Sequence, residues 1–401
     1  MEKEKGFAYN YIDLFAGCGG LSLGLHAAKW QGLFAIEKNH SAFKTLEYNL
    51  LTKRKHFAWP SWLEKCNHNI DEVLKNNHKE LKLLAGEVAL VAGGPPCQGF
   101  SLAGKRDEND DRNLLANSYL DFVRLVKPRI ILFENVRGFG TGFKNSTGKR
   151  GRPYSDIVIE RLKEMGYNDA ESRIIDFSRF GIPQQRRRFI IVGTLAGNSA
   201  SFFKLLEEKR ERFLAKKGIN ALTTLAEAIS DIERKHGEVD SPDSLHFKAG
   251  LRGTQSLSKY QEAMRKDCSS DQPDSHRFVN HSKRIINKFH DIIANRLSNY
   301  QIREKYGTKK TSTQLLGADK PCFTLTTLPD DFVHYAEPRI PTVREYARIQ
   351  SFPDWFEFKG EYTTGSKIRR HTVPRYSQVG NAIPPLFAEL CGIVLKELVA
   401  R

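Results

Sequence analysis

The sequence predicts an α/β fold with a doubly wound, mostly parallel sheet, joined to a smaller and more irregular domain. Through the first two hundred residues, short apolar segments alternate with helical patterns, which is typical of a parallel sheet covered by helices on both faces. After Gly193 the pattern becomes charged and irregular, and regular order returns only near residue 342. A length of 401 residues agrees with about two domains.

The strands of the first domain are predicted from short apolar runs, and a helix is predicted over residues 21–29 from apolar residues at helical spacing. In sheets of this kind, ligands bind beyond the carboxyl ends of the strands. The unusual motifs of this half lie at strand ends, which makes those ends the candidate site. The predicted strands are residues 11–15, 33–36, 88–92, 129–133 and 189–192.

The second half is predicted to form a basic domain and then to return to the first domain. Charged helices are expected over 201–217 and 222–233, and few clear periods occur between 236 and 320. A helix over 342–356 should end at Pro353, and an apolar helix over 385–399 should pack on the main core. The expected division is therefore 1–194, 195–340, and a return segment over 341–401.

Composition excludes several classes of protein and favours a polyanionic partner. The chain has 63 Lys and Arg against 47 Asp and Glu, a formal net charge of +16, which suggests nucleic acid. No apolar run is long enough for a membrane helix, and the amino terminus lacks the apolar core of a signal peptide. Six scattered cysteines without a C-x-x-C pair indicate a reducing cytosol rather than disulfides. No histidine spacing indicates a metal site.

The first motif is F-A-G-C-G-G, between the first predicted strand and the first helix. Gly17, Gly19 and Gly20 allow a ligand to approach the backbone beside the positive end of the helix. The spacing departs from the G-x-G-x-x-G of dinucleotide folds, which weakens NAD as a candidate. Glu37 ends the second strand, where an acid can bond ribose hydroxyls, and Phe15 is placed to stack on an adenine. The alternative is a tight structural turn with a solvated glutamate.

The second motif, G-G-P-P-C-Q-G-F-S over residues 93–101, places Cys97 just after a buried strand. Two prolines fix the backbone and prevent a helix before the cysteine. A cysteine held in this way can act as a nucleophile if its thiolate is favoured, whereas most free cysteines are small buried hydrophobic residues. Cys18 is a competing thiol, but it lies inside the glycine turn.

Two further motifs supply charge at strand ends. Glu134 follows the strand over 129–133, where a carboxyl group can donate a proton or bond a ring nitrogen; the alternative is an acid that faces water. Residues 184–188, Q-Q-R-R-R, precede the last strand. Strand alternation places Arg186 and Arg188 on one face, where they could clamp a base or a phosphate. The alternative for these arginines is surface solubility.

Together and in this order, the motifs resemble those of bacterial DNA (cytosine-5)-methyltransferases. The resemblance covers nearly the whole chain and implies a Rossmann-like, S-adenosylmethionine-dependent domain, with a target recognition domain between the arginine motif and the residue 344–356 segment. The matching segments are DLFAGCGG (13–20), GGPPCQGFS (93–101), ENV (134–136), QQRRR (184–188), REYARIQSFPDWF (344–356) and QVGNAIPP (378–385).

The resemblance also implies a mechanism. Cys97 would attack C6 of a flipped-out cytosine, and Glu134 would bond N3 and the exocyclic amine. C5 then takes the methyl group of S-adenosylmethionine, leaving S-adenosylhomocysteine, before the C5 proton is lost and Cys97 is expelled. Arg186 and Arg188 would hold the base and the catalytic loop. Covalent activation is needed because C5 of cytosine is otherwise a weak nucleophile, and the base must leave the stack to be reached.

Contact residues follow from the same matches. The adenine amine would be bonded by Asn69 or Asp71, and the register of the sequence leaves both open. DNA contacts are expected from Gln98, Ser101 and Thr324, and from the basic residues Lys283, Arg284 and Lys288, which would meet phosphates. The cofactor contacts carried over are Phe15, Gly17, Gly19, Gly20, Leu21, Glu37, Pro96 and Asn381.

The implied partner is double-stranded DNA, for a monomeric enzyme of the bacterial cytoplasm. It would be either paired with a separate restriction endonuclease or solitary, and the sequence leaves both open. Two alternatives remain: a tRNA cytosine-5 methyltransferase on the same scaffold, and a DNA-binding protein that keeps the fold without catalysis. The intact set of Cys97, Glu134, Arg186 and Arg188 argues against the binding protein, because binding alone needs none of them.

Overall fold

The computed structural model describes residues 9–96, 115–141, 151–254, 256–308, 310, 312–363 and 372–399. The chain divides into two compact units. Unit 1 comprises Met1–Asp176, Arg187–Glu211 and Phe387–Arg401, and unit 2 comprises Phe177–Arg186 and Arg212–Leu386. The chain thus returns to unit 1 at Phe387, so residues 341–386 belong to unit 2. The functional roles assigned above to the three ranges stay predictions.

Unit 1 contains a six-stranded sheet with the order β2-β1-β3-β4-β7-β5. Strands β1 to β4 are parallel, whereas β7 is antiparallel to both of its neighbours. The doubly wound, mostly parallel sheet is therefore confirmed, with an antiparallel strand that the sequence pattern did not distinguish. The strands are β1 (Asn10–Leu14), β2 (Gln31–Ile36), β3 (Leu90–Gly93), β4 (Ile130–Val136), β5 (Glu171–Asp176) and β7 (Arg187–Thr194).

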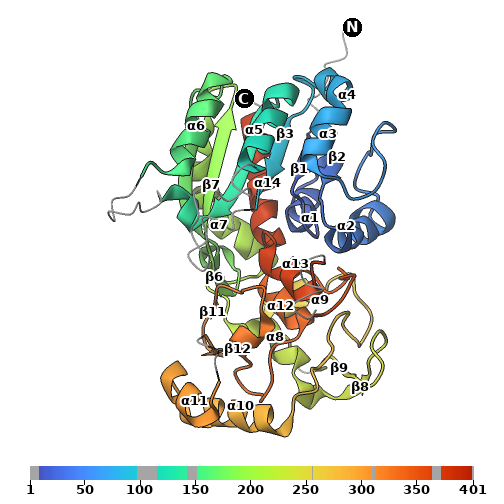
Figure 1. The fold of residues 1–401 in the computed structure, drawn as a ribbon, viewed down its shortest axis with the longest axis vertical. Coiled ribbons are helices and arrows are strands. Elements are labelled where there is room, and N and C mark those ends of the chain that lie inside the picture. The colour runs from blue at the N-terminus through green and yellow to red at the C-terminus, as the bar shows by residue number, and fades with distance from the viewer. Residues whose placement is uncertain are drawn as a thin grey trace. The chain divides into compact units, whose positions relative to one another are not determined.

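Helices cover both faces of this sheet (Figure 1). On one face lie α3 (Ile70–Asn76), α4 (His78–Leu83), α5 (Leu115–Val126) and α6 (Tyr154–Glu164), whose apolar residues join the sheet in one buried cluster. The other face carries α14 (Pro385–Val399), which packs beside α1 (Gly20–Ala27): Trp30, just after α1, donates from Nε1 to the carbonyl of Gly392 at 2.8 Å. The predicted helix over 385–399 is confirmed. Helix α2 (His40–Leu46) and a π-helical turn (Glu47–Lys53) follow β2.

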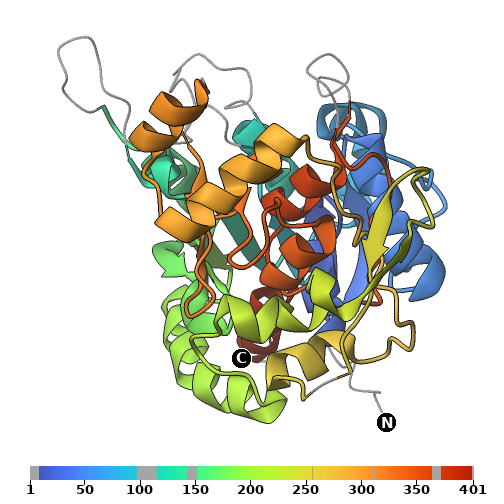
Figure 2. The same ribbon diagram turned by 90° about the horizontal axis from the view of Figure 1, so that it is seen from below.

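Unit 2 is built from short helices and two-residue or three-residue strand pairs. The parallel pairs are β6 (Gln184–Gln185) with β11 (Cys322–Phe323), and β10 (Gln314–Leu315) with β12 (Phe332–Val333); β8 (Glu238–Asp240) pairs with β9 (Lys248–Gly250) antiparallel. Helices α10 and α11 lie against each other (Figures 1 and 2). The helices of unit 2 are α8 (Leu225–Ile229), α9 (Lys259–Arg265), α10 (Lys283–Asn295), α11 (Asn299–Tyr306), α12 (Val343–Ile349) and α13 (Arg375–Asn381), and α7 (Ser199–Lys217) runs across the unit boundary.

Two predicted helices end earlier than expected. The helix predicted over 342–356 is wrong beyond Ile349, because Ser351 adopts a left-handed conformation with φ 60°. The amide of Phe352 then donates to the carbonyl of Ala347 at 2.9 Å, which closes the helix before Pro353 is reached. The helix predicted over 222–233 is likewise only α8 followed by a 3-10 turn over Ser230–Ile232.

None of the helices in the described part of the chain is long and apolar enough to cross a membrane.

Candidate active site

The candidate site of unit 1 lies at one edge of the sheet. Because β1 to β4 are parallel, their carboxyl ends meet at this edge. The antiparallel β7 brings its amino end to the same edge, where Arg188 pairs with Val136 at the end of β4. The glycine turn, Glu37, the segment that leads to Cys97, and Glu134 therefore share an edge with Arg188.

The glycine turn after β1 is strained and open. Phe15, Gly17 and Gly19 all have positive φ values, of 58°, 57° and 93°. For a phenylalanine this conformation is costly, and such strain is frequent at ligand sites. A Cβ atom on Gly19 would lie 3.1 Å from Cδ1 of Leu50, whereas one on Gly17 would meet nothing within 4 Å. The space beside Gly17 is thus free for a ligand. Gly20 and Leu21 begin α1 and are buried.

Glu37 is held against this turn by two backbone amides. The amide of Gly17 donates to Oε2 at 2.9 Å, and that of Asn39 donates to Oε1 at 2.6 Å. Burial raises the pKa of Glu37, and these backbone donors oppose that rise. Each carboxylate oxygen has a further lone pair, so the group can still accept from two hydroxyls. This arrangement fits a ribose diol.

Asn69 and Asp71 begin α3 near the end of β2. The amide of His68 donates to the carbonyl of Glu37 at 2.8 Å, which fixes the segment there. Oδ1 of Asn69 accepts from the amide of Asp71 at 3.2 Å, and Oδ1 of Asp71 accepts from Oγ of Ser118 at 2.6 Å. Asp71 is therefore engaged with α5 through Oδ1, and Asn69 caps α3 through its own Oδ1.

Asp13, in the middle of β1, is a buried residue to which the sequence analysis assigned no role. Its Oδ2 accepts from Oγ of Ser22 on α1 at 2.5 Å. Burial raises the pKa of Asp13 to about 7, the Ser22 hydrogen bond lowers it, and the nearby charge of Glu37 raises it. The only sequence signal for this role was the aspartate that begins the D-L-F-A-G motif. The pair links the strand to the helix on either side of the turn.

The raised pKa of Asp13 gives a prediction about stability. An unfolded Asp has a pKa of about 3.9, so between about pH 4 and 7 only the folded protein holds this proton, and stability falls as the pH rises through that window. Because Asn cannot ionise, Asp13→Asn should gain stability relative to the wild type as the pH rises. The free energy of unfolding in urea at pH 4.5 and 7.5 measures this difference, and an unchanged difference would contradict the assignment.

Glu134 and Arg188 form an ion pair across β4 and β7. Nε of Arg188 lies 3.0 Å from Oε1 of Glu134, and both side chains are 13% exposed. Burial lowers the pKa of Arg188, and the charge of Glu134 opposes this shift. A Cβ atom on Gly94 would lie 2.8 Å from Oε2 of Glu134, so a glycine is needed where the Pro95-Pro96 segment passes the carboxylate.

Asn135 ties β4 to the chain just before Cys97. It is 2% exposed, and its Nδ2 donates to the carbonyl of Pro95 at 3.4 Å. Pro96 follows and is exposed. The sequence analysis named the E-N-V motif but gave Asn135 no role. Cys97 itself lies outside the described residues, as do Gln98 and Ser101.

Other predicted site residues lie in unit 2. Arg186 is 2% exposed and directly follows β6. Oγ1 of Thr324 donates to the carbonyl of Gln185 at 2.7 Å, which ties the two-residue strands β6 and β11 together. Asn381 ends α13 and is exposed.

The three basic residues predicted to meet DNA lie on α10 but differ in exposure. Lys283 and Arg284 are exposed in its first turn. Lys288 is only 9% exposed, and its Nζ lies over the ring of Phe289, 5.1 Å from the ring centre. Burial lowers the pKa of Lys288. The geometry therefore favours Lys283 and Arg284 for contact with phosphates.

Among the residues that the structure describes, no cluster of His, Cys, Asp and Glu could hold a metal ion. No disulfide joins the cysteines in the described part of the chain.

A family model described as C-5 cytosine-specific DNA methylase matches residues 9–397. The chain belongs to this family. As a member of the cytosine-5 DNA methylases, it is 31% identical to the type II methyltransferase M.DdeI of Desulfomicrobium norvegicum over 95% of this chain and 86% of the relative. It is 29% identical to the type II methyltransferase M.XorII of Xanthomonas oryzae over 95% and 83%. These matches confirm the resemblance found in the motifs.

The fold of this methylase also has solved counterparts. A candidate DNA modification methyltransferase encoded within an E. coli prophage aligns with a TM-score of 0.62 and 22% identity, over 98% of this chain and 99% of that structure. The likeness bears on the fold alone and agrees with the Rossmann-like arrangement. The family assignment makes the protein a DNA (cytosine-5)-methyltransferase rather than a tRNA enzyme or a binding protein. Family and fold imply S-adenosylmethionine as methyl donor.

Proposed function

We propose that this methyltransferase modifies C5 of a flipped-out cytosine in one short sequence of duplex DNA, with Cys97 as the nucleophile. The observation that carries the proposal is the buried pair of Glu134 and Arg188, 3.0 Å apart. It lies beside Gly94, in the segment that leads into Cys97. A pure binding surface has no need of a carboxylate desolvated in this way.

In the reaction, the thiolate of Cys97 forms a bond to C6 of the cytosine and breaks the C5–C6 double bond. Glu134 in its protonated form donates its proton to N3 and accepts a hydrogen bond from the exocyclic amine. The electron pair that C6 addition places on C5 then takes the methyl group. A base then takes the C5 proton, the electron pair of the C5–H bond restores the C5–C6 double bond, and Cys97 leaves as a thiolate. Arg188 keeps the carboxylate of Glu134 oriented, and Asn135 fixes the backbone before the nucleophile through the carbonyl of Pro95.

S-adenosylmethionine supplies an electrophilic methyl group on its sulfonium. We assign its adenosine to the turn formed by Phe15, Gly17, Gly19, Gly20 and Leu21, because the space beside Gly17 is open. Glu37 would accept from the ribose hydroxyls. The adenine amine is a donor and needs an acceptor. Asp71 is the favoured candidate, because Ser118 donates to its Oδ1 and its second carboxylate oxygen can accept from the amine, whereas Oδ1 of Asn69 already accepts from the amide of Asp71. Pro96 and Asn381 complete the proposed set.

The ribose assignment predicts that Glu37→Gln weakens S-adenosylmethionine binding by about tenfold to a hundredfold, the range expected for hydrogen bonds to a charged group. The amide would also turn its NH2 group toward a backbone N–H, which opens the turn. Isothermal titration measures the dissociation constant. Glu87→Gln, at an exposed position before β3, is the control and should bind normally. An unchanged affinity in Glu37→Gln would rule out the ribose role.

On the DNA side, we propose that residues 195–340 act as the target recognition domain. Lys283 and Arg284 would contact phosphates, which position the protein without specifying sequence, and Thr324, Gln98 and Ser101 would lie near the target nucleotide. The enzyme would act as a monomer in the bacterial cytoplasm, either beside a separate restriction endonuclease or alone. The type II names of its relatives support the pairing with an endonuclease.

The deciding experiment is expression in a host that lacks cytosine methylation, followed by bisulfite sequencing of its genome. We expect 5-methylcytosine at one short recurring sequence. If folded protein that binds S-adenosylmethionine leaves the genome unmethylated, the proposal of a sequence-specific DNA substrate is wrong.

A further inference from the structure

A chain of hydrogen bonds between two buried glutamines runs through unit 2. Nε2 of Gln184 donates to Oε1 of Gln350 at 2.9 Å. Both side chains are fully buried. Gln184 lies on β6, and Gln350 directly follows α12. The two residues are far apart in the sequence and belong to different motifs, the arginine motif and the 344–356 segment.

Each end of this amide pair contacts the backbone of another motif. Oε1 of Gln184 accepts from the amide of Leu325 at 2.9 Å. Nε2 of Gln350 donates to the carbonyls of Val379 and Ala382, at 2.9 Å and 3.3 Å. Leu325 is the neighbour of Thr324, and the two carbonyls flank Asn381.

The partners fix the direction of both amides. A 180° flip of either side-chain amide would place a donor opposite a donor, or an acceptor opposite an acceptor. Because both amides are buried, such a mismatch would cost free energy. The bonds therefore run in one order, from Leu325 through Gln184 and Gln350 to Val379 and Ala382. A second close contact joins the same segments: a Cβ atom on Gly380 would lie 2.8 Å from the carbonyl oxygen of Thr326.

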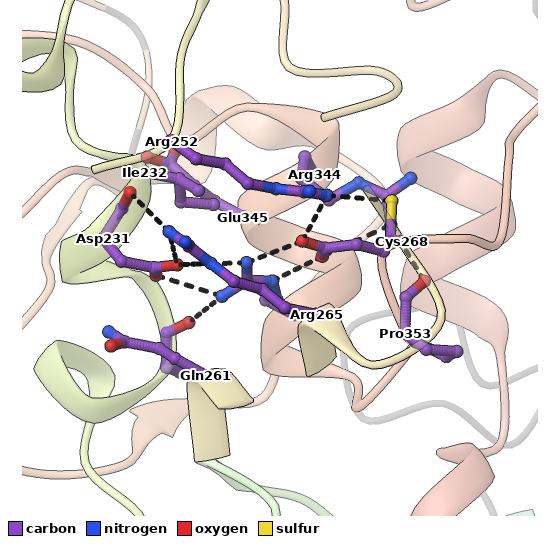
Figure 3. A network of polar contacts seen from close by, with 12 residues as sticks. Asp231, Ile232, Arg252, Gln261, Arg265, Cys268, Arg344, Glu345 and Pro353 are labelled. Carbon is purple, nitrogen blue, oxygen red and sulfur yellow. Dashed lines mark hydrogen bonds and ion pairs between the residues drawn. The ribbon is translucent and has the colours of Figure 1, made fainter. Parts of the chain in front are cut away.

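A network of buried charges holds α12, the helix that Gln350 directly follows. Nε of Arg348 lies 2.6 Å from Asp354, and its Nη1 lies 3.0 Å from Asp231. Arg252 reaches Asp354 at 2.7 Å, and Arg265 reaches Asp231 at 2.5 Å. Figure 3 shows Asp231, Arg252 and Arg265 converging in this network.

Each aspartate of this network is paired with at least two arginines. Burial alone would raise the pKa of Asp354, but Arg348 holds that pKa at about 2. The end of α12 is thus a rigid support for the side chain of Gln350.

We propose that Gln350, acting with Gln184, is a positioning residue that links two binding events. When the cofactor contacts Asn381, the hydrogen bonds of the two glutamines would help to place Arg186 and Thr324 around the target nucleotide. The inference rests on the proposed roles of those three residues. Arg186 lies two residues beyond Gln184, and Thr324 is next to Leu325. If cofactor binding shifts the end of α13, Gln350 and Gln184 would transmit the shift to the segments that carry Arg186 and Thr324, because neither amide can adopt a second orientation.

The test is Gln350→Met, which keeps the volume and removes the hydrogen bonds. The dissociation constant of S-adenosylhomocysteine is measured with and without a duplex that carries the methylated sequence, and the ratio of the two constants gives the coupling. In the wild type, DNA should tighten this binding. In Gln350→Met the ratio should fall toward one, by about threefold or more, and kcat should fall with it.

Gln261→Met is the matched control. Gln261 is also buried, and its Nε2 donates to the carbonyl of Ala226 and to Oγ of Ser230, so these hydrogen bonds do not reach the motif segments. Gln261→Met should lower Tm by about as much as Gln350→Met does, and it should leave the coupling ratio at its wild-type value. Should Gln350→Met fail to fold by circular dichroism, Gln184→Met, which keeps the bonds from Gln350 to Val379 and Ala382, takes its place.

The inference would be overturned by a wild-type coupling ratio of one, or by equal coupling ratios in the wild type and Gln350→Met. Equal loss of coupling in Gln261→Met would reduce Gln350 to a stabilising residue and would overturn it too. A wild type that transfers no methyl group to DNA would instead refute the proposed function, so the two failures are distinguishable.

Discussion

Cys97→Ala is expected to abolish methyl transfer while DNA binding persists. Without the bond from sulfur to C6, C5 of cytosine stays too weak a nucleophile to take the methyl group. The loss should reach at least about 10⁴-fold in kcat, the scale seen when a nucleophile is removed from an enzyme. Transfer of a labelled methyl group to duplex DNA measures the rate, and a gel-shift assay measures binding. Methylation that persists in the variant would eliminate Cys97 as the nucleophile.

Trapping on DNA gives an independent readout of the same residue. A fluorine at C5 of the target cytosine cannot leave as a proton, so the wild type should remain covalently attached to 5-fluorocytosine DNA, and Cys97→Ala should not. Cys66→Ser, at a partly exposed thiol, is the control and should trap normally. The competing thiol in the glycine turn is unsuited to attack, because burial raises the pKa of Cys18 to about 12.

Glu134→Gln is expected to lower kcat by about 10²-fold to 10⁴-fold, the usual contribution of a positioned acid or base, with little loss of DNA affinity. Gln cannot protonate N3, and its neutral amide holds Arg188 less firmly. Single-turnover methylation measures the effect on the chemical step. Glu134→Ala should in addition lower Tm, because it leaves the buried guanidinium of Arg188 unpaired, at a cost of roughly 3–5 kcal/mol.

The matched control for this pair is Glu171→Gln on β5. Glu171 contacts Arg173 at 2.8 Å, but these side chains are 31% and 49% exposed, and surface ion pairs contribute about 0–1 kcal/mol. Both kcat and Tm should stay near the wild-type values. If Glu134→Gln retained full activity, the carboxylate of Glu134 would have only a structural role. The proposed protonation of N3 by Glu134 would then be wrong.

The sequence alone determined the sheet and the places where its chemistry lies. Strands made of consecutive apolar residues, such as Val88–Ala92, must be buried on both faces, which is typical of a mostly parallel sheet. Parallel strands in turn gather their carboxyl ends at one edge. The positions of the glycine turn, Glu37 and Glu134 relative to those strands could therefore be predicted, as could a methyl-donor cofactor and a DNA substrate.

Only the tertiary structure decided how these residues meet. An apolar strand has the same composition in either direction, so the pattern over 189–192 could not show that β7 is antiparallel. That direction is what brings Arg188 to Glu134. Sequence patterns also could not show the capture of Glu37 by the amide of Gly17, or the bond between Gln184 and Gln350. These contacts join residues that are distant along the chain, and their directions depend on backbone groups whose positions no local pattern specifies.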